Sequence, residues 1–266
     1  CMRSTAPCIA WAVWKIAQGD PDANIIVAPS DHVITNETEF RKVIQQGVDF
    51  VSQHNALLTL GIQPNRPETG YGYIRIDSQT STTEPANLDK VAAFVEKPNL
   101  EKAQYYLESG NYCWNAGIFL WNAQTIISAF NTYQPAIASI FDQAAPVWNT
   151  PEESKYFEMS FPDCPNISID YAILEKADNI YVKTAAFGWS DLGTWGSLHE
   201  LSVKDENKNQ LNGRISLYET TNSVIIAPPN KRVIVQGLDN YIVADTPDAL
   251  LICRKDQEQR IKEFVK

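Results

Sequence analysis

The stretch Ile25-Ile26-Val27-Ala28-Pro29-Ser30-Asp31-His32 joins a short apolar run to a polar turn, and it decides the fold class. A continuous apolar run of this length is typical of a strand that is covered on both faces. In open α/β sheets ligands bind beyond the carboxyl ends of strands, so Asp31 is well placed to hold a metal ion. Asp31 could equally cap the turn that follows, and its position alone leaves both interpretations open.

Predicted helices and strands alternate after this run, which indicates an α/β fold. Asn36 and Glu39 have the spacing of a capping box at the start of a helix. Gly110 would end another helix that begins near Asn99. The range 146–166, rich in Pro, Asp and Asn, is predicted to be irregular. Further strands are predicted at 57–62, 73–77, 91–95, 117–121 and 180–184, and further helices after Ser4, at 123–133, at 136–144 and at 168–177.

The pattern changes after about residue 205, where short β stretches follow one another at roughly ten-residue spacing. Pro, Gly, Asn and Asp residues separate them, as expected for tight turns. We therefore predict two domains, an α/β domain over 1–205 and a small all-β domain over 206–266 that ends in a helix. The all-β domain could serve as a packing surface between copies of the protein, because short exposed strand edges need cover.

The composition excludes several classes of function. The chain has 266 residues and a net charge of −10, so it lacks the basic surface that nucleic acids require. No apolar run approaches the roughly 18 residues of a membrane span, and we expect no signal peptide. The five cysteines form no CxxC pair, which argues against a disulfide framework or a zinc ribbon and favours the cytoplasm. An acidic protein that binds phosphates must use locally concentrated cations, backbone N–H groups or a metal ion.

Three short strings near predicted strands carry polar side chains suited to a sugar phosphate. Gly70 and Gly72 could let backbone N–H groups approach a ligand, although a simple β-turn explains them as well. Glu96 could accept sugar hydroxyls and Lys97 could bind a phosphate, but the pair could also be a solvated strand end. The Asn115 amide could both donate to and accept from a hydroxyl, or it could bond its own turn.

The string Gly188-Trp189-Ser190-Asp191-Leu192-Gly193-Thr194-Trp195 places an acid among glycines and tryptophans just after a predicted strand. Asp191 could be a metal ligand there, or the cap of a helix that begins near Thr194. Two carboxylates, one lysine and a glycine loop fit a reaction between phosphates, provided that the strand ends converge on one crevice. Carboxylates without a His or Cys cluster favour Mg²⁺.

The strings PSDH, ETGYGYI, FVEKP, WNAGIF and GWSDLGTW occur together in an order and spacing that resemble the sugar-1-phosphate nucleotidyltransferases. They are most similar to the mannose-1-phosphate guanylyltransferases, and Arg3 to Pro7 (RSTAP) resembles a further segment on the nucleotide side. The resemblance implies a Rossmann-like domain with a mixed, mostly parallel sheet, followed by a short left-handed β-helix. It also implies that GMP is transferred from GTP to mannose 1-phosphate, which gives GDP-mannose and pyrophosphate.

The same resemblance assigns roles to the residues singled out above. It implies that Asp31 and Asp191 ligate the metal and that Lys97 binds the phosphate. It also implies that Arg3 and Ser4 contact the nucleotide. The sugar would be contacted by Gly70, Gly72, Glu96 and Asn115. The family's Gly-rich loop, of the form GGxGTRLxPxS…PK, occurs nowhere in this sequence, so we expect the opening strand, loop and helix to be missing from this piece. Two other functions remain open. One is the same chemistry with UTP or dTTP and a glucose phosphate, and the other is a non-catalytic nucleotide-sugar sensor.

Overall fold

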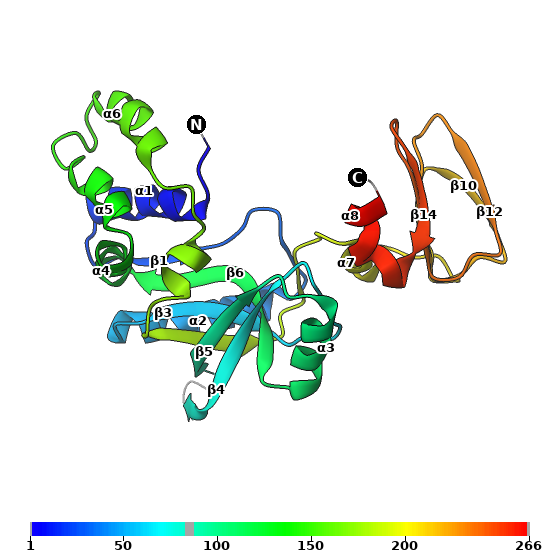
Figure 1. Ribbon diagram of the computed structural model, residues 1–266, viewed down its shortest axis with the longest axis horizontal. Coiled ribbons are helices and arrows are strands. Elements are labelled where there is room, and N and C mark those ends of the chain that lie inside the picture. Colours follow the sequence, from blue (N-terminus) through cyan, green and yellow to red (C-terminus); the bar gives the residue numbers. More distant parts are fainter. Residues whose placement is uncertain (1, 83–87, 265–266) are drawn as a thin grey trace. The chain divides into compact units, whose positions relative to one another are not determined.

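The computed structural model describes residues 2–82 and 88–264, which form two compact units (Figure 1). The first unit comprises Cys1–Ser30 and Ile34–Trp189, and the second comprises Asp31–Val33 and Ser190–Lys266. This division into units lies near residue 190. The domain boundary expected at about residue 205 stays a prediction. Within 2–82 and 88–264, no helix is long and apolar enough to cross a membrane.

A six-stranded mixed sheet forms the centre of the first unit. In spatial order the strands are β1 (Asn24–Val27), β6 (Tyr112–Asn122), β3 (Leu57–Ile62), β7 (Ile180–Ala185), β5 (Leu88–Glu96) and β4 (Gly72–Thr82). Among the described residues of this sheet, only β3 and β7 pair in parallel, and the other neighbouring pairs are antiparallel. The sheet is mixed, as predicted. Four of its strands, β1, β3, β4 and β7, run in one direction, but most neighbouring pairs are not parallel, because β6 and β5 run the other way between them.

The central strands β3 and β6 are buried on both faces. Successive residues of β3 show this, because Leu57 packs into one core and Leu58 into the other. Trp121 and Leu120 of β6 divide in the same way, since side chains alternate across a strand. The first core lies under α1 (Thr5–Ala17), α4 (Ala123–Tyr133) and α5 (Pro135–Asp142), and the second under α2 (Glu37–Gln53) (Figure 1). The two-sided cover predicted for the strand at 25–28 is wrong, because β1 lies at the edge of the sheet and Ile26 is 45% exposed.

Two of the predicted helix ends, the start of α2 and the end of α3, are fixed by local capping. Asn36 accepts a hydrogen bond from the Glu39 N–H at 3.1 Å and so begins α2. The α3 helix (Leu100–Ser109) ends at Gly110, whose φ of 71° lies in the left-handed region that glycine adopts readily. Ser4 precedes α1, but its side chain makes no capping bond.

Two stretches differ from their predicted structure. The range expected to be irregular contains α6 (Glu153–Ser160) and the 3₁₀ turn η1 (Phe161–Asp163). Phe157 packs its ring against Trp11, Trp148 and Phe141, contacts that local composition does not reveal. The helix expected over 168–177 is instead a five-residue π-helix, η2 (Asp170–Leu174), a form that often marks functional sites.

The second unit contains parallel strands that stack as a β-helix. Ile225 pairs with Val243 and Ile215 with Val233, so these neighbouring coils are offset by 18 residues, whereas Ile225 pairs with Leu211 at an offset of 14. Apolar side chains from the two stacks meet in a narrow core centred on Ile225, Val235 and Val243. One stack is β9 (Gln210–Asn212), β11 (Val224–Ile226) and β13 (Tyr241–Asp245), closed by antiparallel β14 (Leu250–Arg254), and the other is β10 (Arg214–Tyr218) with β12 (Arg232–Gln236).

The remaining described elements of the fold are two short strands and three short helical segments. The short strands β2 (Val33–Ile34) and β8 (Trp189–Ser190) pair with each other. A capping box between Thr194 and Ser197 starts α7 (Trp195–Leu201). The helical stretch predicted at the end of the chain is η3 (Lys255–Arg260) followed by α8 (Ile261–Phe264).

Acidification is expected to destabilise the second unit through His199. This side chain is buried, with Nε2 2.8 Å from the Lys208 carbonyl oxygen and Nδ1 3.2 Å from Lys255 Nζ. Burial, and secondarily the Lys255 and Lys204 cations, lower the pKa of His199 despite the hydrogen bond to Lys208 and the charge of Glu200. The unfolded chain therefore takes up this proton more readily, so stability is complete above about pH 6.5 and falls as the pH drops below it.

Thermal unfolding followed from about pH 8 to about pH 5 checks this expectation, because linkage converts the pKa difference into a slope. The melting temperature should fall on the acid side, and His199→Gln should reduce that slope. An unchanged slope in His199→Gln would mean that other groups cause the acid sensitivity.

Candidate functional site

Three of the residues predicted to contact a sugar lie together, with Gly72 at the start of β4, Glu96 at the end of β5 and Asn115 within β6. Gly72 and Glu96 face each other as paired positions of β4 and β5. A Cβ atom on Gly72 would lie 2.5 Å from Glu96 Oε1 and 3.5 Å from the Asn115 Cβ. Only glycine therefore leaves room for the Glu96 carboxylate beside Asn115. These three residues are therefore neighbours, and their role in a sugar site stays a prediction.

Lys97 follows β5 directly and has a φ of 45°, which is uncommon for a residue other than glycine. Its N–H donates to the Tyr71 carbonyl oxygen at 3.2 Å, which helps to hold this backbone conformation. The Lys97 charge lowers the pKa of both Glu96 and Asp170, although burial outweighs it in each case. Lys97 is therefore a cation next to two carboxyl groups at a strand end.

Gly70 does not offer its N–H to a ligand in this structure, because that N–H donates to Glu68 Oε1 at 2.9 Å. Glu68 is almost fully buried and organises the loop. Its N–H donates to the Tyr73 hydroxyl at 3.0 Å, and Oε2 lies 3.3 Å from Arg66 Nε. The Arg66 guanidinium in turn lies 5.1 Å from the centroid of the Trp114 ring. The glycine loop is thus shaped by a buried carboxylate that was not among the residues predicted from the sequence.

Asp170 is a second carboxyl group that was not predicted from the sequence. Its Oδ1 accepts a hydrogen bond from Asn115 Nδ2 at 2.9 Å, which adds it to the group formed by Gly72, Glu96 and Asn115. Burial raises the pKa of Asp170, and burial followed by the charge of Asp170 raises the pKa of Glu96. In the sequence Asp170 looks like an ordinary acid in the first turn of a helix, and the π-helix was not foreseen.

The two predicted metal ligands both belong to the second unit. Asp31 precedes β2, its side chain is 85% exposed and its Oδ1 lies 4.0 Å from His32 Nε2. Asp191 follows β8, and its Oδ1 accepts from the Gly193 N–H at 2.8 Å. A Cβ on Gly193 would lie 2.7 Å from Asp191 Oδ2, so glycine keeps the space beside this carboxylate open.

These donors fit a hard divalent cation. Mg²⁺ is usually held by one or two carboxylates together with phosphates and water, rather than by a complete protein cage. The described part of the chain has no group of three or more His, Cys, Asp or Glu side chains arranged for a metal ion. The placement of the Asp31–Asp191 pair against the sugar-side residues stays a prediction.

Arg3 and Ser4 are engaged with the segment that leads into η2. The Arg3 guanidinium donates to the Pro162 carbonyl oxygen, and the Ser4 N–H donates to Asn166 Oδ1 at 2.8 Å. Arg3 Nε is buried and has no hydrogen-bond partner among the residues that the structure describes. Their expected contact with a nucleotide stays a prediction.

Comparison with known proteins decides the family. A family model described as nucleotidyl transferase matches residues 2–208. The chain belongs to this family. A second model, described as a MannoseP isomerase/GMP-like β-helix domain, matches residues 214–266, in agreement with the stacked strands of the second unit.

Curated relatives match almost the whole chain. A mannose-1-phosphate guanylyltransferase from Escherichia coli is 34% identical over 99% of the chain and 57% of its own length. The xanthan biosynthesis protein XanB of Xanthomonas campestris pv. campestris (strain B100) is 36% identical over 99% of the chain and 55% of its own length. The chain therefore spans a little over half the length of these relatives.

Solved structures agree with the fold of this chain. A Thermus thermophilus protein described as a mannose-1-phosphate geranyltransferase superposes with a TM-score of 0.81 and 27% identity, covering 100% of this chain and 75% of that one. A Helicobacter pylori mannose-6-phosphate isomerase superposes with a TM-score of 0.57 and 26% identity, covering 71% and 70% of the two chains. The first of these likenesses extends over both units.

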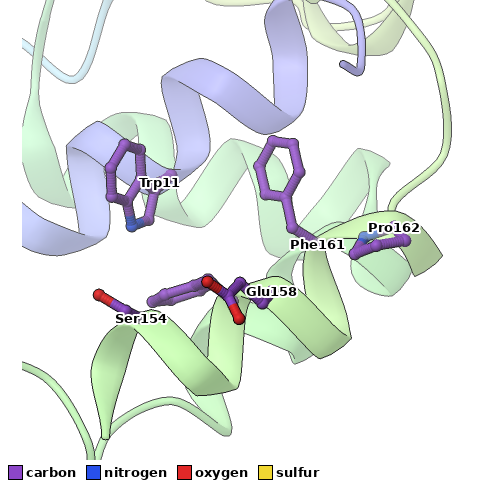
Figure 2. Close-up of a pocket in the computed structure, with 6 residues that line it drawn as sticks. Trp11, Ser154, Glu158, Phe161 and Pro162 are labelled. Atoms are coloured by element: carbon purple, nitrogen blue, oxygen red, sulfur yellow. The ribbon is translucent and has the colours of Figure 1, made fainter. Parts of the chain in front are cut away.

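A separate pocket of about 400 Å³ lies between α1 and the α6–η1 segment (Figure 2). Aromatic rings dominate its walls, and Trp11 meets Phe157 edge to face at 6.1 Å between ring centroids. Ser154 and Glu158 are its polar lining residues. None of the predicted site residues lines it, so it does not contribute to the sugar-side group.

Replacing Gly72 with alanine tests whether glycine is needed to place Glu96. The new Cβ would force the Glu96 carboxylate to move, so we expect the KM for the sugar phosphate to rise about tenfold or more. Thermal stability should change little, because the atom in the way is the end of a flexible side chain. Steady-state kinetics with Gly19→Ala as the control measure this, since a Cβ on Gly19 meets nothing closer than 3.7 Å. Equal KM values for the two variants would contradict the placement role.

Proposed function

We propose that the full-length protein transfers GMP from GTP to mannose 1-phosphate and so produces GDP-mannose and pyrophosphate. The observation that carries this proposal is the group formed by Gly72, Glu96 and Asn115, with the Lys97 cation at the end of the same strand as Glu96. Family membership supports nucleotidyl transfer, and the printed names of several relatives support mannose as the sugar.

Different residues of this chain bind the sugar, the phosphate and the nucleotide. Glu96 and Asn115 bind sugar hydroxyls, with Gly70 and Gly72 shaping the space around them. Lys97 neutralises the phosphate of mannose 1-phosphate. Gly72 is needed because any larger residue displaces Glu96. Arg3 and Ser4 are proposed to lie on the nucleotide side.

The transfer requires no protein nucleophile. An oxygen of the sugar phosphate attacks the α-phosphorus of GTP, the bond from this phosphorus to the bridging oxygen breaks, and pyrophosphate leaves with that electron pair. Positioning and charge neutralisation are then the main contributions of the protein. Asp31 and Asp191 would hold Mg²⁺, which when bound supplies positive charge to the phosphates.

The setting of the reaction is part of the same proposal. We place the protein in the cytoplasm, where cysteines stay reduced, because Cys8, Cys113, Cys164 and Cys253 are all free. A homo-oligomer assembled through the β-helix would cover its strand edges. Neither nucleic acid nor a membrane is an expected partner.

The test is a substrate panel with the full-length protein and Mg²⁺. Pyrophosphate release is measured for GTP, UTP and dTTP, each combined with mannose 1-phosphate or glucose 1-phosphate. GTP with mannose 1-phosphate should give the highest kcat/KM. A preference for UTP or dTTP with glucose 1-phosphate would overturn the substrate assignment, and GDP-mannose binding without any turnover would show a sensor instead.

A further inference from the structure

The Asn115 amide has little hydrogen-bonding capacity left for a ligand. Its Oδ1 accepts from the Gly117 N–H at 3.1 Å and from the Thr59 hydroxyl at 3.3 Å, which is nearer than the alternative acceptor of that hydroxyl, the Ile118 carbonyl oxygen at 3.5 Å. Its Nδ2 donates one hydrogen to Asp170 Oδ1 at 2.9 Å. An amide oxygen accepts two hydrogen bonds and an amide NH₂ donates two, so Asn115 can donate once more and accept nothing. Hydroxyl hydrogens of a sugar beside Asn115 must therefore find another acceptor.

Asp170 supplies such an acceptor from a fixed position. Its backbone is held because the next-door Ile169 is buried and its N–H donates to the Thr5 hydroxyl at 2.9 Å. The wide turn of η2 is closed by the Glu175 N–H, which donates to the Asp170 carbonyl oxygen at 2.9 Å. Asn115 uses only Oδ1 of the Asp170 carboxylate, which leaves Oδ2 to accept from a ligand.

Two carboxylates consequently face the same small region, Glu96 from β5 and Asp170 from η2, with Lys97 as the nearby cation. Like charges this close disfavour each other unless donors lie between them. A polyol offers several O–H donors at the separations needed to satisfy both carboxylates, whereas a phosphate would be repelled by them. Burial raises the pKa of both carboxyl groups, which adds to the benefit of bound hydroxyl donors.

We infer that Asp170 is a specificity-determining residue that accepts a hydrogen bond from a sugar hydroxyl, while Asn115 orients its carboxylate and only donates to the sugar. The inference rests on the proposed function for the identity of the sugar. Two carboxylates, Glu96 and Asp170, thus accept hydrogen bonds from the sugar hydroxyls. Thr5, in the segment expected on the nucleotide side, fixes the position of one of them.

Asp170→Asn is the informative variant, since its amide oxygen can still accept from Asn115 Nδ2 while the negative charge is lost. Pyrophosphate release is measured with mannose 1-phosphate and with its 2-, 3-, 4- and 6-deoxy analogues. In the unmodified protein, one deoxy analogue should lose about 30-fold in kcat/KM, because a hydrogen bond to a charged acceptor is lost. In Asp170→Asn, kcat/KM for mannose 1-phosphate itself should fall by a similar factor. The kcat/KM of that deoxy analogue should then be no lower than the value for mannose 1-phosphate.

Glu175→Gln is the matched control, because Glu175 is exposed, lies just after η2 and also faces Asp170. It should keep the discrimination of the unmodified protein. The inference is overturned if Asp170→Asn also keeps full discrimination against every deoxy analogue, or if it loses thermal stability and activity without any change in discrimination.

Failure of the proposed function has a different signature, because the unmodified protein would then prefer another sugar phosphate or show no turnover. In the first case the preferred sugar and its deoxy analogues replace mannose in the same comparison. In the second, calorimetric titration of mannose 1-phosphate into the unmodified protein and Asp170→Asn decides, and equal affinities would overturn the role of Asp170.

Discussion

Asp191→Asn is expected to lower kcat/KM for pyrophosphate release by about 10³-fold, because charge neutralisation by a bound metal is a large part of catalysis between phosphates. Asparagine keeps an oxygen that can accept from the Gly193 N–H, so the loop should retain its shape. The carboxylate charge is lost, and with it most of the affinity for Mg²⁺. A titration of activity against Mg²⁺ should show a strongly raised half-saturation concentration.

Asp20→Asn is a suitable control for this variant. Asp20 Oδ1 accepts from the N–H two residues ahead, that of Asp22, at 3.0 Å, which is the same local geometry as at Asp191. It is exposed and belongs to the first unit. Asp20→Asn should keep full activity. Wild-type activity and Mg²⁺ dependence in Asp191→Asn would remove this residue from the metal site.

Lys97→Met is expected to lower kcat/KM for mannose 1-phosphate by about 100-fold, through loss of a charge-assisted contact to phosphate. Methionine, like lysine, is unbranched at Cβ, so the cost of the positive φ should be similar in both. Most of the effect should fall on the KM for the sugar phosphate rather than on the KM for GTP.

The pH profile gives a second readout of the same variant. Lys97 lowers the pKa of Glu96, so its removal raises that pKa further. A protonated Glu96 accepts sugar hydroxyls poorly, and the acid limb of activity should therefore move to higher pH. Lys102→Met, on the exposed face of α3, is the control and should change neither the KM nor the pH profile. Identical behaviour of the two variants would argue against a phosphate contact by Lys97.

Signals confined to a few neighbouring residues were the ones that could be predicted from the sequence. The Asn36 cap, the Gly110 stop and the two-sided burial of β3 each depend on local patterns and were found where expected. The helix α6 was missed because Phe157 is held by rings from distant parts of the chain, such as Trp11. The antiparallel insertion of β6 also depends on long-range pairing, which periodicity does not report.

The candidate site divides in the same way. Glu96, Asn115 and the glycine at 72 could be found from motifs, and the reason for the glycine became clear only from its opposite partner in the sheet. Asp170 and Glu68 could not be recognised, because each acts through a contact that depends on the folded chain. The expectation that the Gly70 N–H approaches a ligand did not foresee that Glu68 already accepts from it.

The antiparallel strand β14 sets the length of the β-helix. A stack of parallel strands grows in principle by adding one more coil of the same direction, from the same chain or from another molecule. β14 pairs with β13 along five consecutive positions and runs against it, from Tyr241 opposite Arg254 to Asp245 opposite Leu250. The hydrogen-bonding groups that a further parallel coil would need on that side of β13 are thereby occupied. Growth into a fibre from this edge would first require β14 to peel away.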